Sequence, residues 1–153
     1  MKKVQSFLII VVLVFNTVVF ANADADVRSA YNLWISKVTS AKGNGASVNE
    51  LYADNAVLLA TLDHVPLIMS SQRIKYFNKF TNKKDLNAKT DLLITQVITP
   101  EAAINSGTYT FSFINKKDGK TVTLPARFSF VYKKVGDKWL IINHHSSNLP
   151  AME

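Results

Sequence analysis

Near the start of the chain, apolar residues recur at three- and four-residue intervals. The apolar stripe consists of Val27, Ala30, Tyr31, Trp34 and Val38. This spacing is typical of a helix that buries one face. We therefore expect a helix from Asp24 to about Thr39.

Two further helices are predicted downstream. The segment Ser47 to Glu50 fits a capping box with Ser47 as the cap, which predicts a short helix starting there. A longer helix is predicted from Ser70 to about Asn82, because its apolar residues again lie three and four positions apart. Its apolar side consists of Ile74, Phe77 and Phe80.

From Lys89 onward the pattern changes to alternation and to β-branched residues, which indicates strands. The predicted strands are Ala56–Thr61, Thr90–Thr99, Ala102–Ile114, Thr121–Lys134 and Lys138–Ser147. Asp118-Gly119 is a hairpin signal between two of the long strands. Helices followed by a meander of antiparallel strands predict an α+β class, and 153 residues is a one-domain length.

The first residues have the three-part layout of a secretory signal. Lys2 and Lys3 precede an almost wholly apolar run from Phe7 to Phe20, and Ala21-Asn22-Ala23 offers small residues to a signal peptidase. The alternative is a membrane anchor, but the run is short against the roughly 20 residues that a spanning helix needs. We expect residues 1–23 to be a signal peptide cleaved after Ala23. The mature domain, residues 24–153, would then be periplasmic or secreted, with no membrane attachment.

Charge and cysteine content narrow the function classes. The net charge is +7, but the mature lysines are scattered in pairs beside turns, which is typical of solvated surface and predicts no nucleic-acid partner. The chain has no cysteine, which excludes disulfides, zinc–thiolate sites and cysteine nucleophiles.

The last predicted strand is apolar on both faces at Trp139-Leu140-Ile141-Ile142. A half-exposed strand would alternate with polar residues, so a second cover is needed for one of its faces. Pairing with a second copy of the chain is the simplest cover. We expect a homodimer or larger oligomer whose interface includes Ile141, Ile142, Asn143 and His145.

The C-terminal half carries a more specific motif. Residues 126–134 and 136–147, followed by Pro150, resemble the end of the calcium/calmodulin-dependent protein kinase II association-domain family, which belongs to the nuclear transport factor 2-like, or SnoaL-like, superfamily. Residues 31–34, 51–59 and 106–111 are also similar to small bacterial members. One departure is Asn143, where relatives tend to continue a run of histidines.

The resemblance implies a cone-shaped, curved, mostly antiparallel sheet wrapped around N-terminal helices, as in nuclear transport factor 2-like and cystatin-like folds. It implies a pocket at the open end of the cone and self-association through the sheets. The chain has no kinase motif set, so the resemblance implies no kinase activity.

Arg127 is the first candidate pocket residue, because it interrupts an otherwise apolar strand. A guanidinium inside the cone would need a carboxylate partner or an anionic ligand. The resemblance implies pocket arginines of this kind; the alternative is a rim arginine paired with a surface acid. The other residues expected around this pocket are Tyr109, Ser129, His144, Ser146, Trp34, Tyr52 and Leu59, with core packing as the alternative role for Trp34.

Catalytic groups are harder to identify. His144 and His145 are neighbours on one strand and should face opposite sides, so they cannot share a metal, and no metal or cofactor is expected. Asp63 and His144 are weak catalytic candidates. The sequence therefore favours a ligand-binding or assembly domain with a small polar or carboxylate-bearing ligand near Arg127. The alternative is an isomerase, cyclase or hydrolase acting on a small organic substrate.

Overall fold

A computed structural model describes residues 22–150. A long N-terminal helix spans residues 22–40. The elements that follow are α2 (Gly45–Asn49), β1 (Tyr52–Leu59), α3 (Ser70–Thr81), β2 (Lys84–Thr99), β3 (Ala102–Ile114), β4 (Thr121–Val135) and β5 (Lys138–Asn148). Helices come first and a strand meander follows, so the predicted α+β class is confirmed. The predicted signal peptide lies outside the described residues except for its last two positions.

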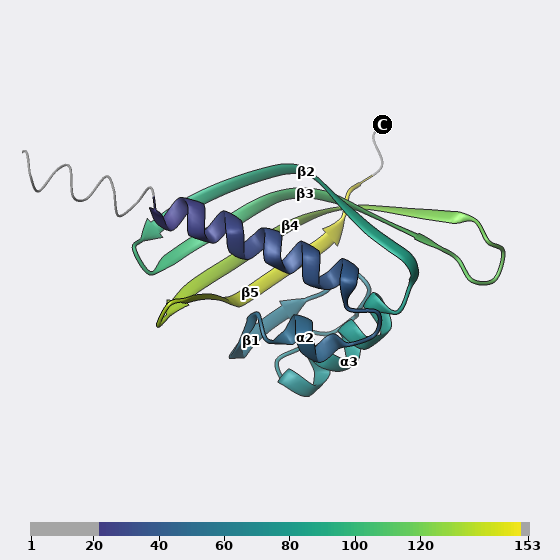
Figure 1. Ribbon diagram of the computed structural model, residues 1–153, viewed down its shortest axis with the longest axis horizontal. Coiled ribbons are helices and arrows are strands. Elements are labelled where there is room, and N and C mark those ends of the chain that lie inside the picture. The colour runs from purple at the N-terminus through teal and green to yellow at the C-terminus, as the bar shows by residue number, and fades with distance from the viewer. Residues whose placement is uncertain (1–21, 151–153) are drawn as a thin grey trace, which may run out of the picture.

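The five strands form one curved, unclosed sheet in the order β1-β5-β4-β3-β2. β1 runs parallel to β5, and the other neighbouring strands are antiparallel. The N-terminal helix lies across one face of the sheet, while α2 and α3 lie beside β1 near one end (Figure 1). We call the face toward this helix the inner face and the opposite one the outer face.

The inner face is lined with aromatic side chains that pack on the helix. Trp34 meets Phe130 edge-on with ring centroids 4.9 Å apart, and Tyr31 stacks on Phe128 at 5.2 Å. Val27 and Val38, from the predicted apolar stripe, are fully buried as well. Burial of these large apolar side chains is the main force that holds the helix on the sheet.

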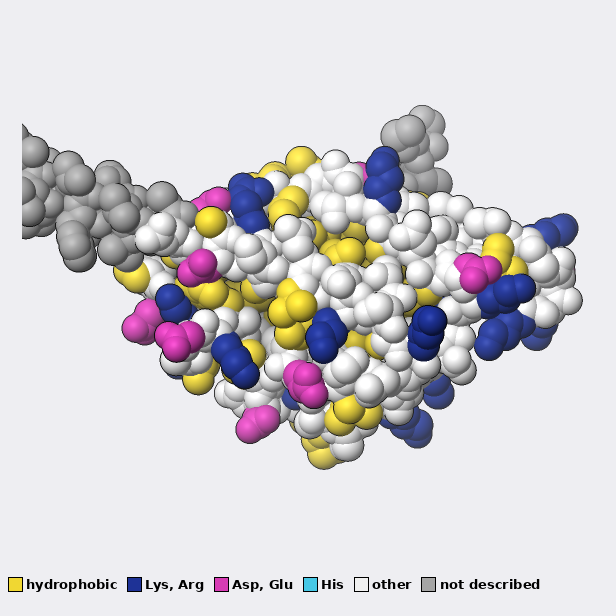
Figure 2. Space-filling model, in the orientation of Figure 1, with side chains coloured by type: hydrophobic (Ala, Val, Ile, Leu, Met, Phe, Trp, Pro, Cys, Tyr) yellow, Lys and Arg dark blue, Asp and Glu magenta, His cyan; other side chains and the backbone are white. Residues whose placement is uncertain are grey.

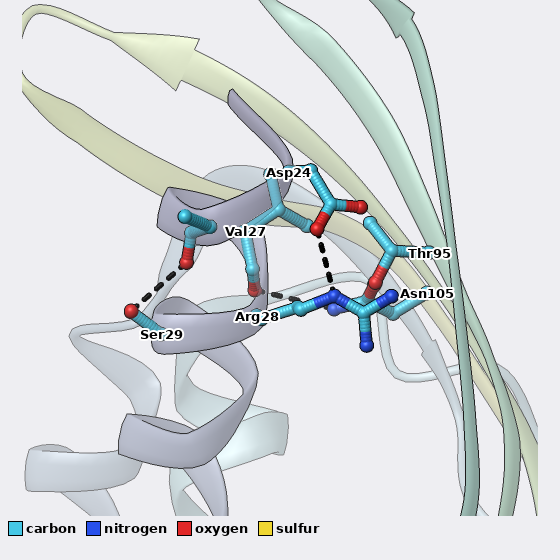
Figure 3. Close-up of polar contacts among 7 residues, drawn as sticks. Asp24, Val27, Arg28, Ser29, Thr95 and Asn105 are labelled. Carbon is cyan, nitrogen blue, oxygen red and sulfur yellow. Dashed lines mark hydrogen bonds and ion pairs between the residues drawn. The ribbon is translucent and has the colours of Figure 1, made fainter. Parts of the chain in front are cut away.

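A buried amide fixes the first turns of the helix on the sheet. Asn105 of β3 donates from Nδ2 to the carbonyl oxygen of Val27 at 3.2 Å, and Thr95 of β2 donates to Asn105 Oδ1 at 2.7 Å. Figure 3 shows these residues beside the Asp24–Arg28 ion pair, whose atoms lie 2.8 Å apart. Since Asn105 is fully buried, its satisfied amide specifies the register between helix and sheet.

Glycine is required where β2 and β3 come closest. The pairing register shifts between Thr90 and Leu92. A Cβ atom built on Gly107 would collide with the carbonyl oxygen of Leu92. The bulge in β2 can therefore press against β3 only because position 107 lacks a side chain.

The predicted start of the short helix was wrong. α2 begins at Gly45, and Asn44 is its N-cap, with its side chain accepting from the backbone N–H of Ser47 at 3.3 Å. Asn satisfies a free helical N–H as well as Ser does, so the cap can lie at Asn44, three residues before the predicted Ser47. β1 starts at Tyr52, four residues before the predicted start of this strand at Ala56.

Candidate functional site

A bulge in β5 decides which C-terminal side chains reach the inner face. Tyr132 of β4 pairs with Ile141, but the next residue, Val131, pairs with Asn143, so Ile142 is an extra residue. Strict alternation would put Ile141 and His144 on opposite faces. The extra residue reverses this phase, and both side chains are buried on the inner face.

His144 lies at the end of a chain of three buried polar side chains. The indole Nε1 of Trp34 donates to the hydroxyl oxygen of Tyr52 at 3.0 Å, and that oxygen lies 2.8 Å from Nδ1 of His144. An indole only donates, so the Tyr52 proton is directed at His144, whose Nδ1 accepts it. The imidazole proton is therefore assigned to Nε2, which has no hydrogen-bond partner within the described residues.

The environment of His144 keeps its imidazole neutral. The ring stacks on Phe130 with centroids 3.9 Å apart. Burial, and to a smaller extent the neighbouring His145, lowers the pKa of His144 to about 3. The imidazole therefore carries no charge at neutral pH and offers a neutral N–H donor.

A second polar chain runs beside the first. The hydroxyl of Tyr109 donates to Ser146 Oγ at 2.6 Å, and Ser146 Oγ lies 2.6 Å from Thr61 Oγ1. Burial raises the pKa of Tyr109 well above its ordinary value. The structure thus brings together five of the expected pocket residues: Trp34, Tyr52, Tyr109, His144 and Ser146.

Four of these side chains line one small cavity. Trp34, Tyr109, His144 and Ser146 line an inner cavity of about 20 Å³, and Tyr76 and Phe80 of α3 close it. Small-molecule sites usually enclose about 300–1,000 Å³. The inner cavity has room for roughly one water molecule.

Arg127 is not in the pocket, and the prediction that it points into the cone is wrong. Its neighbours Ala126 and Phe128 fill the inner face, so alternation turns Arg127 outward, where it is exposed. Its Nε donates to Ser147 Oγ at 3.1 Å. Ser129 shares this outer face and lies 3.3 Å from Ser106 Oγ, so it is not a pocket residue either.

The remaining predicted residues lie near the surface. Leu59 is 38% exposed and pairs with His145 on the outer face, so it does not wall the inner cavity. Asp63 is exposed, and its Oδ1 accepts from the backbone N–H groups of His64 and Val65, at 2.8 and 3.4 Å. That carboxylate shapes a turn and does not project into the cone.

Among the four expected interface residues, one is misplaced. Ile141 is only 1% exposed and belongs to the core, because the bulge leaves it on the inner face. Asn143 and His145 flank the buried His144, so their side chains lie on the outer face, where they pair with Val57 and Leu59 of β1. Ile142 is half-buried at the bulge.

Sequence reasoning missed Arg73 of α3, which is fully buried without a carboxylate partner. Its Nε donates to Asn49 Oδ1 at 2.9 Å. The remaining acceptors are the backbone carbonyls of Ala56, Ile68, Ala53 and Asp54, at 2.6 to 3.3 Å. All five guanidinium N–H groups are thereby satisfied, and Arg73 joins α3 to β1. A signal was available, since position 73 falls in the stripe of Phe77 and Phe80.

No group of three or more His, Cys, Asp or Glu side chains converges in residues 22–150. None of the helices within that range is long and apolar enough to cross a bilayer.

The fold is shared by nuclear transport factor 2-like proteins. One such superfamily protein from Salmonella enterica superposes with a TM-score of 0.75 at 16% identity, covering 88% of this chain and 96% of that one. The association domain of the C. elegans calcium/calmodulin-dependent kinase II gives 0.65 at 13% identity, covering 81% and 94%. At such identities the likeness shows the fold alone.

Sequence similarity identifies the family. The model of the calcium/calmodulin dependent protein kinase II association domain matches residues 24–150. A crystal structure of a candidate association domain from Xanthomonas campestris is 33% identical, with a TM-score of 0.75 over 82% of this chain and 87% of that one. The chain therefore belongs to the association-domain family. No curated protein matches it.

Proposed function

We propose that this chain is an exported self-association domain that forms a homodimer, or a larger assembly built from it, through the outer face of its sheet. The family is named for association, which supports self-assembly. The inner cavity of about 20 Å³ holds no ligand-sized space. That volume also leaves no room for a substrate of the alternative isomerase, cyclase or hydrolase.

The observation that carries the proposal is the composition of the outer face. Cross-strand pairing arranges its residues in rows. One row consists of Leu59, His145, Ser129, Ser106 and Ile94, from β1 to β2. The next consists of Val57, Asn143, Val131, Ile104 and Gln96.

Apolar side chains on this face are accessible. Ile94 is 49% exposed and its neighbour Leu92 is 51% exposed. No element among residues 22–150 packs on this face, since the N-terminal helix covers the other one. A contiguous, partly apolar sheet face suits a two-fold contact in which the same patch serves both copies. Arg127 and Ser147 then face the partner copy instead of a ligand.

Light scattering after size exclusion tests the proposal. The wild-type protein is expected to have the mass of at least two chains, and Ile94→Glu to shift it to one chain, because a buried interface charge without a partner is costly. Leu33→Glu is the matched control, since Leu33 is 47% exposed on the N-terminal helix. A monomeric wild type, or an Ile94→Glu protein with the wild-type mass, would overturn the proposal.

Export rests on the N-terminal residues. Small side chains at Ala21 and Ala23 support cleavage after Ala23, which would make Asp24 the first mature residue. We expect N-terminal sequencing of the secreted or periplasmic protein to begin at Asp24, and Ala23→Arg to block processing. Uncleaved protein that remains inside the cell would contradict export.

A further inference from the structure

A second cavity lies outside the cone and is of ligand size. It encloses about 420 Å³ between α3 and the loop after β1, within the usual range for small-molecule sites. Its apolar wall includes Tyr76 and Phe80 of α3 and Leu62 of the loop, and Leu62 is 50% exposed. An exposed apolar hollow of this size can take the apolar body of a ligand.

Three lysines edge the same cavity. Lys75, Lys79 and Lys83 follow one another at four-residue spacing along α3 and just beyond its end. Lys75 and Lys79 are therefore neighbours on the helix, and like charges at that spacing are mutually destabilising. An anion placed between them would relieve that repulsion.

The positive charge of the three lysines is only partly offset by the protein. Within residues 22–150 the ion pairs are Arg28–Asp24, Lys89–Asp91 and Lys134–Asp26, and none involves these three lysines. The one acid on the cavity, Asp63, is engaged by the backbone of its own turn.

The basic surface continues into an adjoining hollow. This hollow, of about 370 Å³, shares Lys79 and Lys83 and adds Lys84 and Lys116. Lys83 Nζ lies 4.0 Å from the centroid of the Phe113 ring, so the cation sits on an apolar wall. Lys and Arg side chains gather toward this end of the molecule, where the β3–β4 hairpin projects (Figure 2).

We propose that the second cavity binds a soluble amphipathic anion. The apolar body of the anion would lie on Tyr76, Phe80 and Leu62. Its carboxylate, or a similar headgroup, would lie between Lys75, Lys79 and Lys83. The site lies apart from the outer face of the sheet and does not depend on self-association. Charge selects the ligand, because an apolar molecule without a negative group would leave the lysines uncompensated.

Titration calorimetry with decanoate tests the proposal on protein purified from cells expressing the full chain. Decanoate is expected to bind, while decyltrimethylammonium, with the same chain and opposite charge, and acetate, with the headgroup alone, are not. The Lys79→Gln/Lys83→Gln variant should bind decanoate about tenfold more weakly, since an exposed ion pair contributes a factor of a few. Lys138→Gln, at the remote β4–β5 turn, is the control for losing a lysine elsewhere and should bind like wild type.

Three outcomes would overturn the proposal. They are equal binding of the decyl cation and anion, an unchanged affinity in the double lysine variant, and binding to phosphatidylglycerol vesicles without binding of monomeric decanoate. The last would assign the lysines to a membrane surface. Decanoate affinity that falls as salt rises would support the site, because salt screens exposed charges.

Discussion

The hydroxyl oxygen of Tyr52 lies 2.8 Å from Nδ1 of His144, and this contact assigns the tautomer of the imidazole. Tyr52 already accepts the indole N–H of Trp34, so its own proton is free only for His144. Burial keeps the ring neutral, and the contact with Tyr52 leaves its one proton on Nε2.

A pH dependence of stability follows from the buried imidazole. The pKa of His144 falls from 6.5 to about 3 on folding. Below pH about 6.5 the unfolded chain binds a proton that the folded chain does not, so this stabilisation is present above that pH and lost toward about 3. Urea unfolding between about pH 7 and about pH 5 should show stability falling by up to about 1.4 kcal/mol per pH unit.

Two histidine variants separate this effect from other titrations. His144→Gln should flatten the slope, whereas His145→Gln, which changes the exposed neighbour, should retain it. A nuclear magnetic resonance titration of wild type should find the His144 ring neutral throughout that range. An imidazolium signal at His144 near pH 6 would disprove the assignment.

Removing the Tyr52 hydroxyl should lower the free energy of unfolding by more than the loss of one small group would suggest. Tyr52→Phe leaves the Trp34 indole N–H and His144 Nδ1 without partners, which is expected to destabilise the fold by about 1–3 kcal/mol. Tyr76→Phe is the control, since Tyr76 is half-buried and its hydroxyl has no protein partner in the described part of the chain. Equal unfolding midpoints for the two variants would count against the hydrogen-bond chain.

Even a conservative replacement of Arg73 should destabilise the fold. Arg73→Lys offers three donors where the site uses five, so about 2–4 kcal/mol of stability should be lost. The substitution Arg28→Lys, at a half-buried position on the N-terminal helix, should stay within about 0.5 kcal/mol of wild type. Urea midpoints compare the two variants directly. A wild-type midpoint for Arg73→Lys would show that the hydrogen bonds from the guanidinium to the four backbone carbonyls do not stabilise the fold.

The helices and strands could be predicted from the sequence because their hydrophobic periodicities are regular. The stripe from Val27 to Val38 and the exact bounds of β3 follow from spacing alone. The family resemblance supplied the curvature of the sheet, and the structure confirms it. Local periodicity therefore predicts the elements, whereas their arrangement in a curved sheet was predicted from the family resemblance.

The site was harder to predict from the sequence, because one extra residue in β5 reverses which side chains face inward. Alternation along β5 cannot reveal that Ile142 is a bulge, so Ile141 was assigned to the interface. The outward position of Arg127 could have been read from Ala126 and Phe128, whose apolar side chains fill the inner face. The burial of Arg73 could have been inferred from its place in the stripe of Phe77 and Phe80, but its acceptors are backbone carbonyls, which leave no mark in a side-chain pattern.

The central claim is that two copies meet through their outer faces, and a distance between copies tests it most directly. The chain has no cysteine, so Ser129→Cys and Ser36→Cys each carry a single nitroxide label, on the outer face and on the exposed side of the N-terminal helix. Packed sheets lie about 10 Å apart, so double electron–electron resonance should give a shorter distance between copies at position 129 than at position 36. A shorter distance at position 36, or no coupling between copies at position 129, would contradict association through this face.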